Sequence, residues 1–234
     1  MDGTTPSRQS ALYTSPLDVT RSAAIRARGF DARGRSGPVS EARFVVDKDL
    51  IPLETERWTV WDAPGSKPPS AWRVSERAID QTSNVLVEGA IPLGKDPAVE
   101  RLGSLYTYNG GTEFCDGTFS FTVNSSDDDG VGAVFRLGDV GHYYLWTMNS
   151  QKHYRLLACK QGDTYKVLAI NNSGFTPKQT YQVTIQCDGP RMTVFVDGKK
   201  DLEAEDVTYS RGTVGLYSWG NSGVRFGELV LKAD

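Results

Sequence analysis

The feature that most constrains the fold is a series of short runs rich in β-branched and aromatic residues, which extends from Trp58 to Leu231. The runs are WTVWD, AWRVS, SLYTY, GTFSFTV, GAVFRLG, YYLWTM, YRLLACK, YKVLAI, YQVTIQC, RMTVFVDG, GTVGLYSW and VRFGELVL. Gly, Asn, Asp and Pro separate them at spacings of roughly 8 to 14 residues, and no helical period runs through them. The pattern predicts an all-β antiparallel β-sandwich of the jelly-roll kind.

Alternation within the runs supports this assignment. In TYQVTIQC, the residues Tyr181, Val183 and Ile185 form an apolar set, while the residues between them are polar. Because successive side chains of a strand point to opposite faces, one face is expected to be core and the other solvent or ligand. GTFSFTV alternates in the same way.

Charge and composition exclude several classes of protein. The 234 residues carry a formal charge of −3, and Lys and Arg are scattered, which argues against a nucleic acid partner. No run approaches the roughly 18 apolar residues that span a membrane, and the N-terminus has no export signal. The three cysteines lack zinc-site spacing, and we expect Cys159 and Cys187 to be small buried hydrophobes.

The first 46 residues differ from the rest of the chain. They are rich in Ser, Thr, Arg and Gly and contain three candidate strands, LYTSPLDV, AAIRARGF and VSEARFVV. So small a segment would struggle to bury a core, and it begins on Asp2-Gly3, a turn dipeptide that normally joins two strands. We therefore expect two domains, 1–46 and 47–234, with a strand missing before the first and the chain being a fragment of a larger protein.

The N-terminal segment resembles the small β-sandwich module at the C-termini of chitobiase and related hexosaminidases. The matching features are DG-x-x-P near the start, Leu12-Tyr13, Pro16-Leu17, the strand around Ile25 and the closing strand that begins at Ser40. That module occurs in many secreted bacterial glycan-processing proteins. The resemblance implies a partial copy of it here.

Residues 50 to 232 resemble the concanavalin A-like (laminin-G-like) lectin and glucanase sandwiches. The matching blocks are Trp58, Trp61-Asp62, DDDGVGAVFR, HYYLWTMNSQKHYRLL, TVFVDGK and GTVGLYSWGNSGVRFGELVL. The resemblance implies a non-catalytic carbohydrate-binding or adhesion accessory module of a larger secreted bacterial protein, with covalently attached neighbouring domains and a secreted or cell-surface location.

Sugar binding requires an aromatic platform for the pyranose ring and planar polar groups for its hydroxyls. Such side chains are concentrated around the run HYYLWTM and at the end of GLYSWGN. The candidate glycan ligands are Arg136, Tyr144, Trp146, Asn149, Tyr154, Arg155, Trp219 and Asn221. Tyr143 and Leu145 alternate with Tyr144 and Trp146, so one pair is expected in the core and the other exposed.

The stretch NSSDDDGVGAVFRLGD suggests a metal site. An EF-hand is excluded, because its twelfth position would be Arg136 instead of a bidentate Glu. Two interpretations remain: a hydrated turn, or a calcium ion bound by Asp127 or Asp129 with backbone carbonyls. The resemblance implies a second structural calcium site, between Asp62 and Glu228.

A catalytic reading is the alternative. Glycosidases need two carboxylates about 5 to 10 Å apart, and the nearest arrays are Glu54 with Glu56 and Glu203 with Glu205, both of which fit solvated loops better. A polysaccharide lyase would need a Tyr, His and Arg set. Suitable residue types occur at His142, Tyr144, His153 and Arg155. A structural spacer or protein-interaction module is the third alternative.

Overall fold

The chain forms two compact units. The computed structural model describes residues 4–17, 23–44, 50–87 and 103–233. The units are Met1–Asp49 and Leu50–Asp234, and the boundary expected between residues 46 and 47 lies outside the described residues. Each unit is described by itself below.

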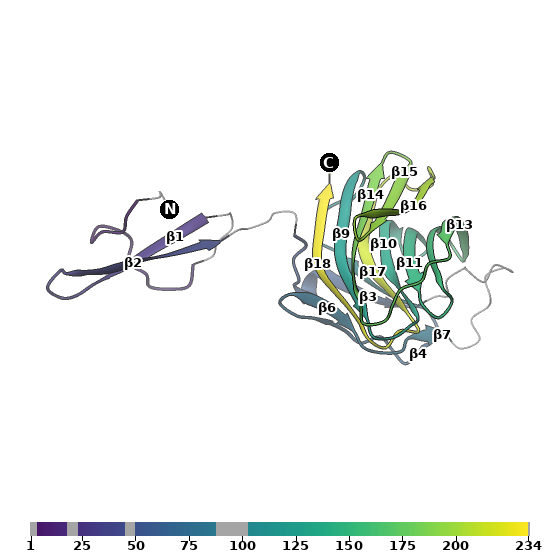
Figure 1. Ribbon diagram of the computed structural model, residues 1–234, viewed down its shortest axis with the longest axis horizontal. Helices are drawn as coiled ribbons and strands as arrows, with labels where there is room; N and C mark the ends of the chain where they lie inside the picture. Colours follow the sequence, from purple (N-terminus) through teal and green to yellow (C-terminus); the bar gives the residue numbers. More distant parts are fainter. Residues whose placement is uncertain (1–3, 18–22, 45–49, 88–102, 234) are drawn as a thin grey trace. The chain divides into compact units, whose positions relative to one another are not determined.

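The N-terminal unit is built on one hairpin. Strands β1 (Ala23–Phe30) and β2 (Ser36–Phe44) pair antiparallel, with Ala27 opposite Ser40 (Figure 1). The predicted strand in LYTSPLDV does not form over its described part, residues 12–17. Its side chains Leu12 and Tyr13 are 86% and 70% exposed. The segment contains Pro16, whose backbone has no N–H to donate to a ladder.

The larger unit is a sandwich of two antiparallel sheets, each with seven strands (Figure 1). In spatial order, sheet I consists of β13 (Thr164–Asn171), β12 (Tyr154–Gln161), β11 (His142–Asn149), β10 (Gly130–Asp139), β17 (Thr213–Trp219), β8 (Ser104–Tyr108) and β3 (Trp58–Asp62). Sheet II consists of β16 (Lys199–Glu205), β15 (Arg191–Val196), β14 (Thr180–Asp188), β9 (Gly117–Ser125), β18 (Val224–Ala233), β6 (Ala78–Gln81) and β5 (Trp72–Val74). The predicted all-β sandwich is confirmed.

Two short elements complete the unit. Strands β4 (Ser66–Lys67) and β7 (Leu86–Val87) form a small ribbon, and η1 (Thr55–Arg57) is a single 3-10 turn. Across the described residues, no helix has the length and apolar character that a membrane span requires.

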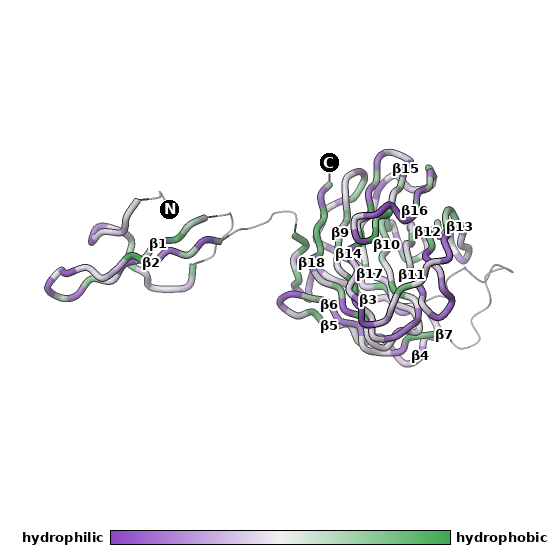
Figure 2. Tube along the Cα trace, viewed as in Figure 1, coloured by the Kyte–Doolittle hydropathy of each residue, from purple (hydrophilic) through white to green (hydrophobic). Residues whose placement is uncertain are grey.

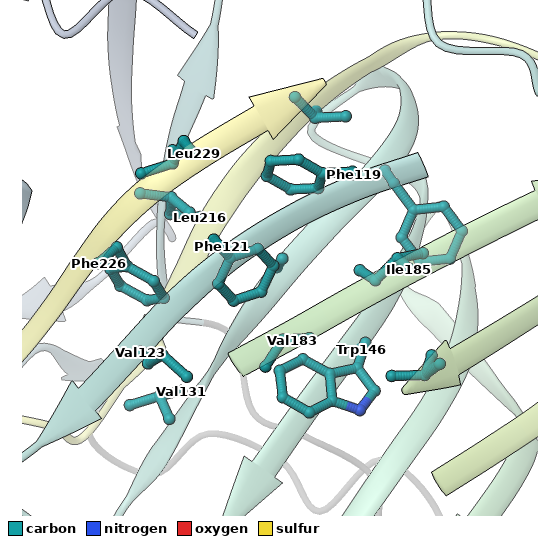
Figure 3. Packing of buried hydrophobic residues seen from close by; sticks show 14 of the residues in the cluster. Phe119, Phe121, Val123, Val131, Trp146, Val183, Ile185, Leu216, Phe226 and Leu229 are labelled. Atoms are coloured by element: carbon teal, nitrogen blue, oxygen red, sulfur yellow. The ribbon is translucent and has the colours of Figure 1, made fainter. Parts of the chain in front are cut away.

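The main core lies between the two sheets. Phe119 and Phe121 of β9 point inward and pack with Phe226 of β18 and with Trp146 of β11 (Figure 3). Tyr181, the first of the apolar set in β14, is 6% exposed, and the residues that alternate with it are more exposed. The predicted alternation is therefore confirmed for β14. Figure 2 shows that hydrophilic and hydrophobic segments are mixed along the strands of this unit.

Sheet I also carries apolar side chains on its outer face. Tyr143 and Leu145 of β11 are at most 1% exposed, although they alternate with the equally buried Tyr144 and Trp146. They belong to a second cluster, which also contains Leu105, Val134, Leu137, Tyr217 and Trp219. The prediction that one of the two pairs is exposed is wrong, because alternation gives a wet face only where nothing covers that face.

The cysteines are structural. Cys159 and Cys187 are buried and free, as expected for small hydrophobes. Burial raises the pKa of the Cys187 thiol to about 12, so this sulfur stays protonated and unreactive at neutral pH.

Candidate functional site

Four predicted ligand and metal residues come together at the end of sheet I where β10 begins and β11 and β17 end. Gly130 pairs with Trp219, and Val131 pairs with Met148. This register places Asp129 and Asn149 beside Trp219. We call the group that gathers here the rim cluster; it consists of Asp127, Asp128, Asp129, Asn149, Lys152 and Trp219.

The three aspartates converge. Each of them offers a carboxylate oxygen, and these three atoms lie within 4.8 Å of one another. Asp127 is already engaged, because its carboxylate accepts hydrogen bonds from the backbone N–H and the hydroxyl of Ser222, at 2.8 and 2.6 Å. It also accepts the backbone N–H of Asp128 at 2.8 Å. Asp127 therefore ties the loop after β17 to the turn before β10.

Asp129 is the member of the rim cluster whose ionised carboxyl group is in an unfavourable environment. Its Oδ1 atom is buried and makes no well-formed hydrogen bond with the part of the chain that the structure describes. Burial raises the pKa of its carboxyl to about 6, and the charges of Asp128 and Asp127 add to the shift. A buried acceptor without a partner is costly, so this oxygen is suited to receive a donor from a ligand.

Asn149 supplies a complementary donor. The residue is fully buried, and its Oδ1 accepts the backbone N–H of Lys152 at 2.7 Å. Among the described residues its Nδ2 makes no well-formed hydrogen bond, but a side-chain hydrogen bond from Asn149 to Asp129 lowers the pKa of that carboxyl. The amide of Asn149 and the carboxylate of Asp129 therefore face each other without a well-formed hydrogen bond between them.

Lys152 covers the aromatic member of the cluster. Its Nζ lies 4.8 Å from the centre of the Trp219 ring, a cation–π distance, and its charge also lowers the pKa of Asp129. Trp219 is 6% exposed. Lys152 was not predicted from the sequence, because its position depends on the pairing of β10 with β17.

Asn221 lies beneath the rim cluster but has a structural role. It is fully buried, and its Nδ2 donates to the Oγ of Ser125 at 2.8 Å and to the backbone oxygen of Asp129 at 3.2 Å. The Nε2 of Gln81 donates in turn to the Asn221 carbonyl. The prediction that Asn221 contacts a glycan is wrong, since its amide is used to join loops.

Arg136 is also not a ligand residue. Its side chain is 2% exposed, and its guanidinium donates to the carbonyls of Cys115, Gly189 and Tyr209 at 2.7 to 3.2 Å. A fourth partner is the carboxylate of Asp116 at 3.1 Å. Arg136 lies at a register shift of β10 with φ of 46°, and the local bend directs its side chain into the fold.

Three aromatic candidates are buried as well. Tyr144 and Trp146 are fully buried in the intersheet core, and the Tyr144 hydroxyl donates to the carboxylate of Asp206 at 2.8 Å. Figure 3 shows Trp146 among the packed core residues. Tyr154 is 3% exposed and belongs to a small apolar cluster with Leu156. These three predictions are wrong, because Tyr144 and Trp146 pack in the core between the sheets and Tyr154 packs in its own apolar cluster.

Arg155 is held between the sheets. It donates to the carboxylate of Asp201 at 3.0 Å and to the carbonyl of Gly174 at 3.1 Å, and its side chain is 13% exposed. Its guanidinium also lies 5.6 Å from the Tyr181 ring centre. These contacts leave it joining β12 to β16 instead of facing a ligand.

The oxygen ligands of the rim cluster meet part of what a calcium site requires. The convergent carboxylates have the right chemistry, but Ca²⁺ takes six to eight oxygens. Asp127 is occupied by Ser222, and Asn149 presents an N–H to the cluster. Asp62 and Glu228 stand outside this group of carboxylates. Asp62 has one buried oxygen without a partner, and Glu228 is exposed on β18, so their calcium site stays a prediction.

Asp129→Asn should stabilise the protein at pH 7. Because the folded-state pKa, about 6, lies above the unfolded value of 3.8, the carboxyl favours folding below about pH 4 and loses this contribution as the pH rises through 6. Removing the charge should add about 1 to 2 kcal/mol. Urea denaturation from pH 4 to 8 measures it, and a gain at pH 4 as large as that at pH 8 would contradict the assignment.

Comparison with known proteins supports the fold of both units. Residues 1–41 match the family model of the chitobiase/beta-hexosaminidase C-terminal domain. No curated protein matches the chain. The larger unit shares its antiparallel β-sandwich fold with the solved structures described next.

Among solved structures, the carbohydrate binding module CBM66 from Bacillus subtilis has a TM-score of 0.57 and 16% identity, over 74% of this chain and 93% of that one. A native glycosidic hydrolase has a TM-score of 0.50 and 11% identity, over 76% and 90%. The galectin LEC-6 of Caenorhabditis elegans is a weaker likeness, with a TM-score of 0.41 and 13% identity, over 52% and 91%.

Proposed function

We propose that the sandwich is a non-catalytic glycan-binding module and that the rim cluster is its binding site. The module would belong to a larger secreted bacterial protein with further domains attached, as the chitobiase-type segment at the N-terminus suggests. A fold alone does not fix a function. The observation that carries the proposal is the rim cluster, in which an aromatic ring adjoins a donor and an acceptor that make no well-formed hydrogen bond within the described part of the chain.

The chemistry of the cluster suits a sugar. A hydroxyl both donates and accepts, so it can satisfy the Oδ1 of Asp129 and the Nδ2 of Asn149, which are both buried and only weakly paired with each other. Trp219 is 6% exposed and lies under the Lys152 ammonium, so its ring can stack on the C–H face of a pyranose once Lys152 has moved away. The fold likeness to a carbohydrate-binding module is consistent with this use.

A glycan array should reveal binding that depends on Trp219. We expect Trp219→Ala to weaken binding at least tenfold, because the variant loses the stacking platform. Phe195→Ala is the matched control, since Phe195 is a half-buried aromatic residue on β15 of sheet II. Thermal melting of both variants checks folding. Wild-type protein that binds no glycan would favour the spacer alternative instead.

A hydrolase or lyase is the alternative that the likeness to a glycosidic hydrolase favours. The residues that a lyase would need do not come together. His142 begins β11 and His153 follows the end of that strand, so the two histidines lie roughly 23 Å apart at about 3.3 Å per residue. Tyr144 is buried in the core and Arg155 is paired with Asp201. Reducing-end release from the polysaccharide that the array identifies would contradict our proposal.

Calcium stabilisation is a separate proposal, supported by the three convergent carboxylates. Calcium at 100 times its Kd would add about 2.7 kcal/mol, which for a unit of this size is roughly 5 to 10 °C in Tm. Thermal melting with calcium and with EDTA measures this difference. Identical Tm values with calcium and with EDTA would contradict the proposal that calcium stabilises this protein.

A further inference from the structure

An ammonium group already lies in the rim cluster. The Lys152 Nζ lies over the Trp219 ring, at 4.8 Å from its centre, and attracts the carboxylate of Asp129. An aromatic face beside a carboxylate is the usual recognition chemistry for organic cations. The protein thus fills this position with one of its own side chains.

The surrounding charge favours a cation. The carboxylates of Asp127, Asp128 and Asp129 converge, and Lys152 is the basic side chain that acts on Asp129. In the calcium-free protein, one ammonium against three carboxylates leaves a negative excess, so an anionic sugar would be repelled and a cationic one attracted. Hydrogen bonds satisfy Asp127, which leaves Asp129 as the charged partner for a ligand.

The polar atoms of the rim cluster indicate which chemical groups a cationic ligand should carry. Among the described residues, neither the Oδ1 of Asp129 nor the Nδ2 of fully buried Asn149 makes a well-formed hydrogen bond. A ligand that offers both a donor and an acceptor can therefore replace the weak interaction between these two side chains. A protonated amine can donate to Asp129, and a hydroxyl on the neighbouring carbon can accept from Asn149. An amine and a hydroxyl on neighbouring carbons form a vicinal amino alcohol, which is the group found in a 2-amino-2-deoxy sugar.

The side chain of Lys152 can leave without unfolding the turn. Its backbone N–H is held by Asn149, and the preceding residues Ser150 and Gln151 both donate to the carbonyl of Asp128. With the described residues its ammonium makes no ion pair within 4.0 Å. A half-exposed lysine changes rotamer on the nanosecond scale, so a ligand can displace it.

We propose that the rim cluster binds an amino sugar with a free, protonated amine, which displaces Lys152 from the Trp219 ring and bridges Asp129 and Asn149. This inference rests on the glycan-binding function proposed above, and it names the ligand class of the same site.

Calorimetry at pH 6.5 tests the proposal with two probes, a glucosamine hexamer and an N-acetylglucosamine hexamer. We expect the free-amine oligomer to bind at least tenfold more tightly. Asp129→Asn should remove that preference, since it loses a charge-assisted hydrogen bond. Lys152→Ala should bind the free-amine oligomer about two- to fivefold more tightly, because it removes the internal competitor. Lys200→Ala, an exposed lysine of β16, should change nothing.

The outcomes separate this inference from the function on which it rests. Equal affinity for both oligomers would overturn the amino-sugar assignment but leave glycan binding intact. If Asp129→Asn bound the free-amine oligomer as tightly as the wild type does, the binding would reflect a general attraction of the cationic oligomer to an acidic protein. This result would also overturn the inference. Failure of every glycan to bind would overturn both. Asp129→Asn is expected to fold, so its result is decisive.

Discussion

Arg136→Ala should destabilise the sandwich by about 3 to 5 kcal/mol, the usual cost of breaking a buried charged network by removing one partner. The guanidinium holds three backbone carbonyls, those of Cys115, Gly189 and Tyr209, which come from separate connections. Without it these acceptors lose their donor, and the connections lose the group that fixes them together. Guanidinium chloride denaturation measures the loss.

Arg225→Ala is the matched control for this variant. The guanidinium of Arg225 also makes two short contacts to a carboxylate, that of Asp80, at 2.7 and 2.9 Å, but its side chain is 65% exposed. An exposed pair contributes at most about 1 kcal/mol. If Arg136→Ala kept its stability and lost glycan binding, the sequence-based assignment of Arg136 as a ligand would be right after all.

The fold was predictable because its determinants are local. Strands such as β14 carry their own alternation, as in Tyr181, Val183 and Ile185, and most turns contain Gly, Asn, Asp or Pro. Where both faces of a strand are buried, as at Tyr143 and Tyr144, alternation could not tell the two faces apart. The N-terminal strand expected in LYTSPLDV was predicted wrongly, because alternation says nothing about whether a partner strand is present.

The candidate site was predictable in part, for the same reason. Asp127, Asp129, Asn149 and Trp219 all end or precede a strand, and such positions meet at the ends of a sandwich. Burial of Arg136 depends on Tyr209, 73 residues away, and no local pattern indicates it. Lys152 escaped prediction because its contact with Trp219 crosses two strand pairings.

Gly132→Ala should be nearly as damaging as Arg136→Ala, although it adds a single methyl group. A Cβ on Gly132 would lie 2.0 Å from the carbonyl oxygen of Trp146 and 2.8 Å from the Cα of Thr147. Both are backbone atoms of β11, which cannot rotate away, so β10 and β11 must separate where they also pack the core. We expect a loss of about 3 kcal/mol, or roughly 6 to 12 °C in Tm.

Gly138→Ala is the internal control for this prediction, since it lies on the same strand. Its Cβ would meet nothing closer than 3.9 Å, and the residue is exposed. It should therefore melt within a degree or two of wild type. Because β10 leads directly from Asp129, separating it from β11 should also pull Asp129 away from Asn149. Gly132→Ala should thus lose glycan binding even below its Tm, whereas Gly138→Ala keeps it. Full binding by a destabilised Gly132→Ala would mean that the rim cluster does not depend on this strand pairing.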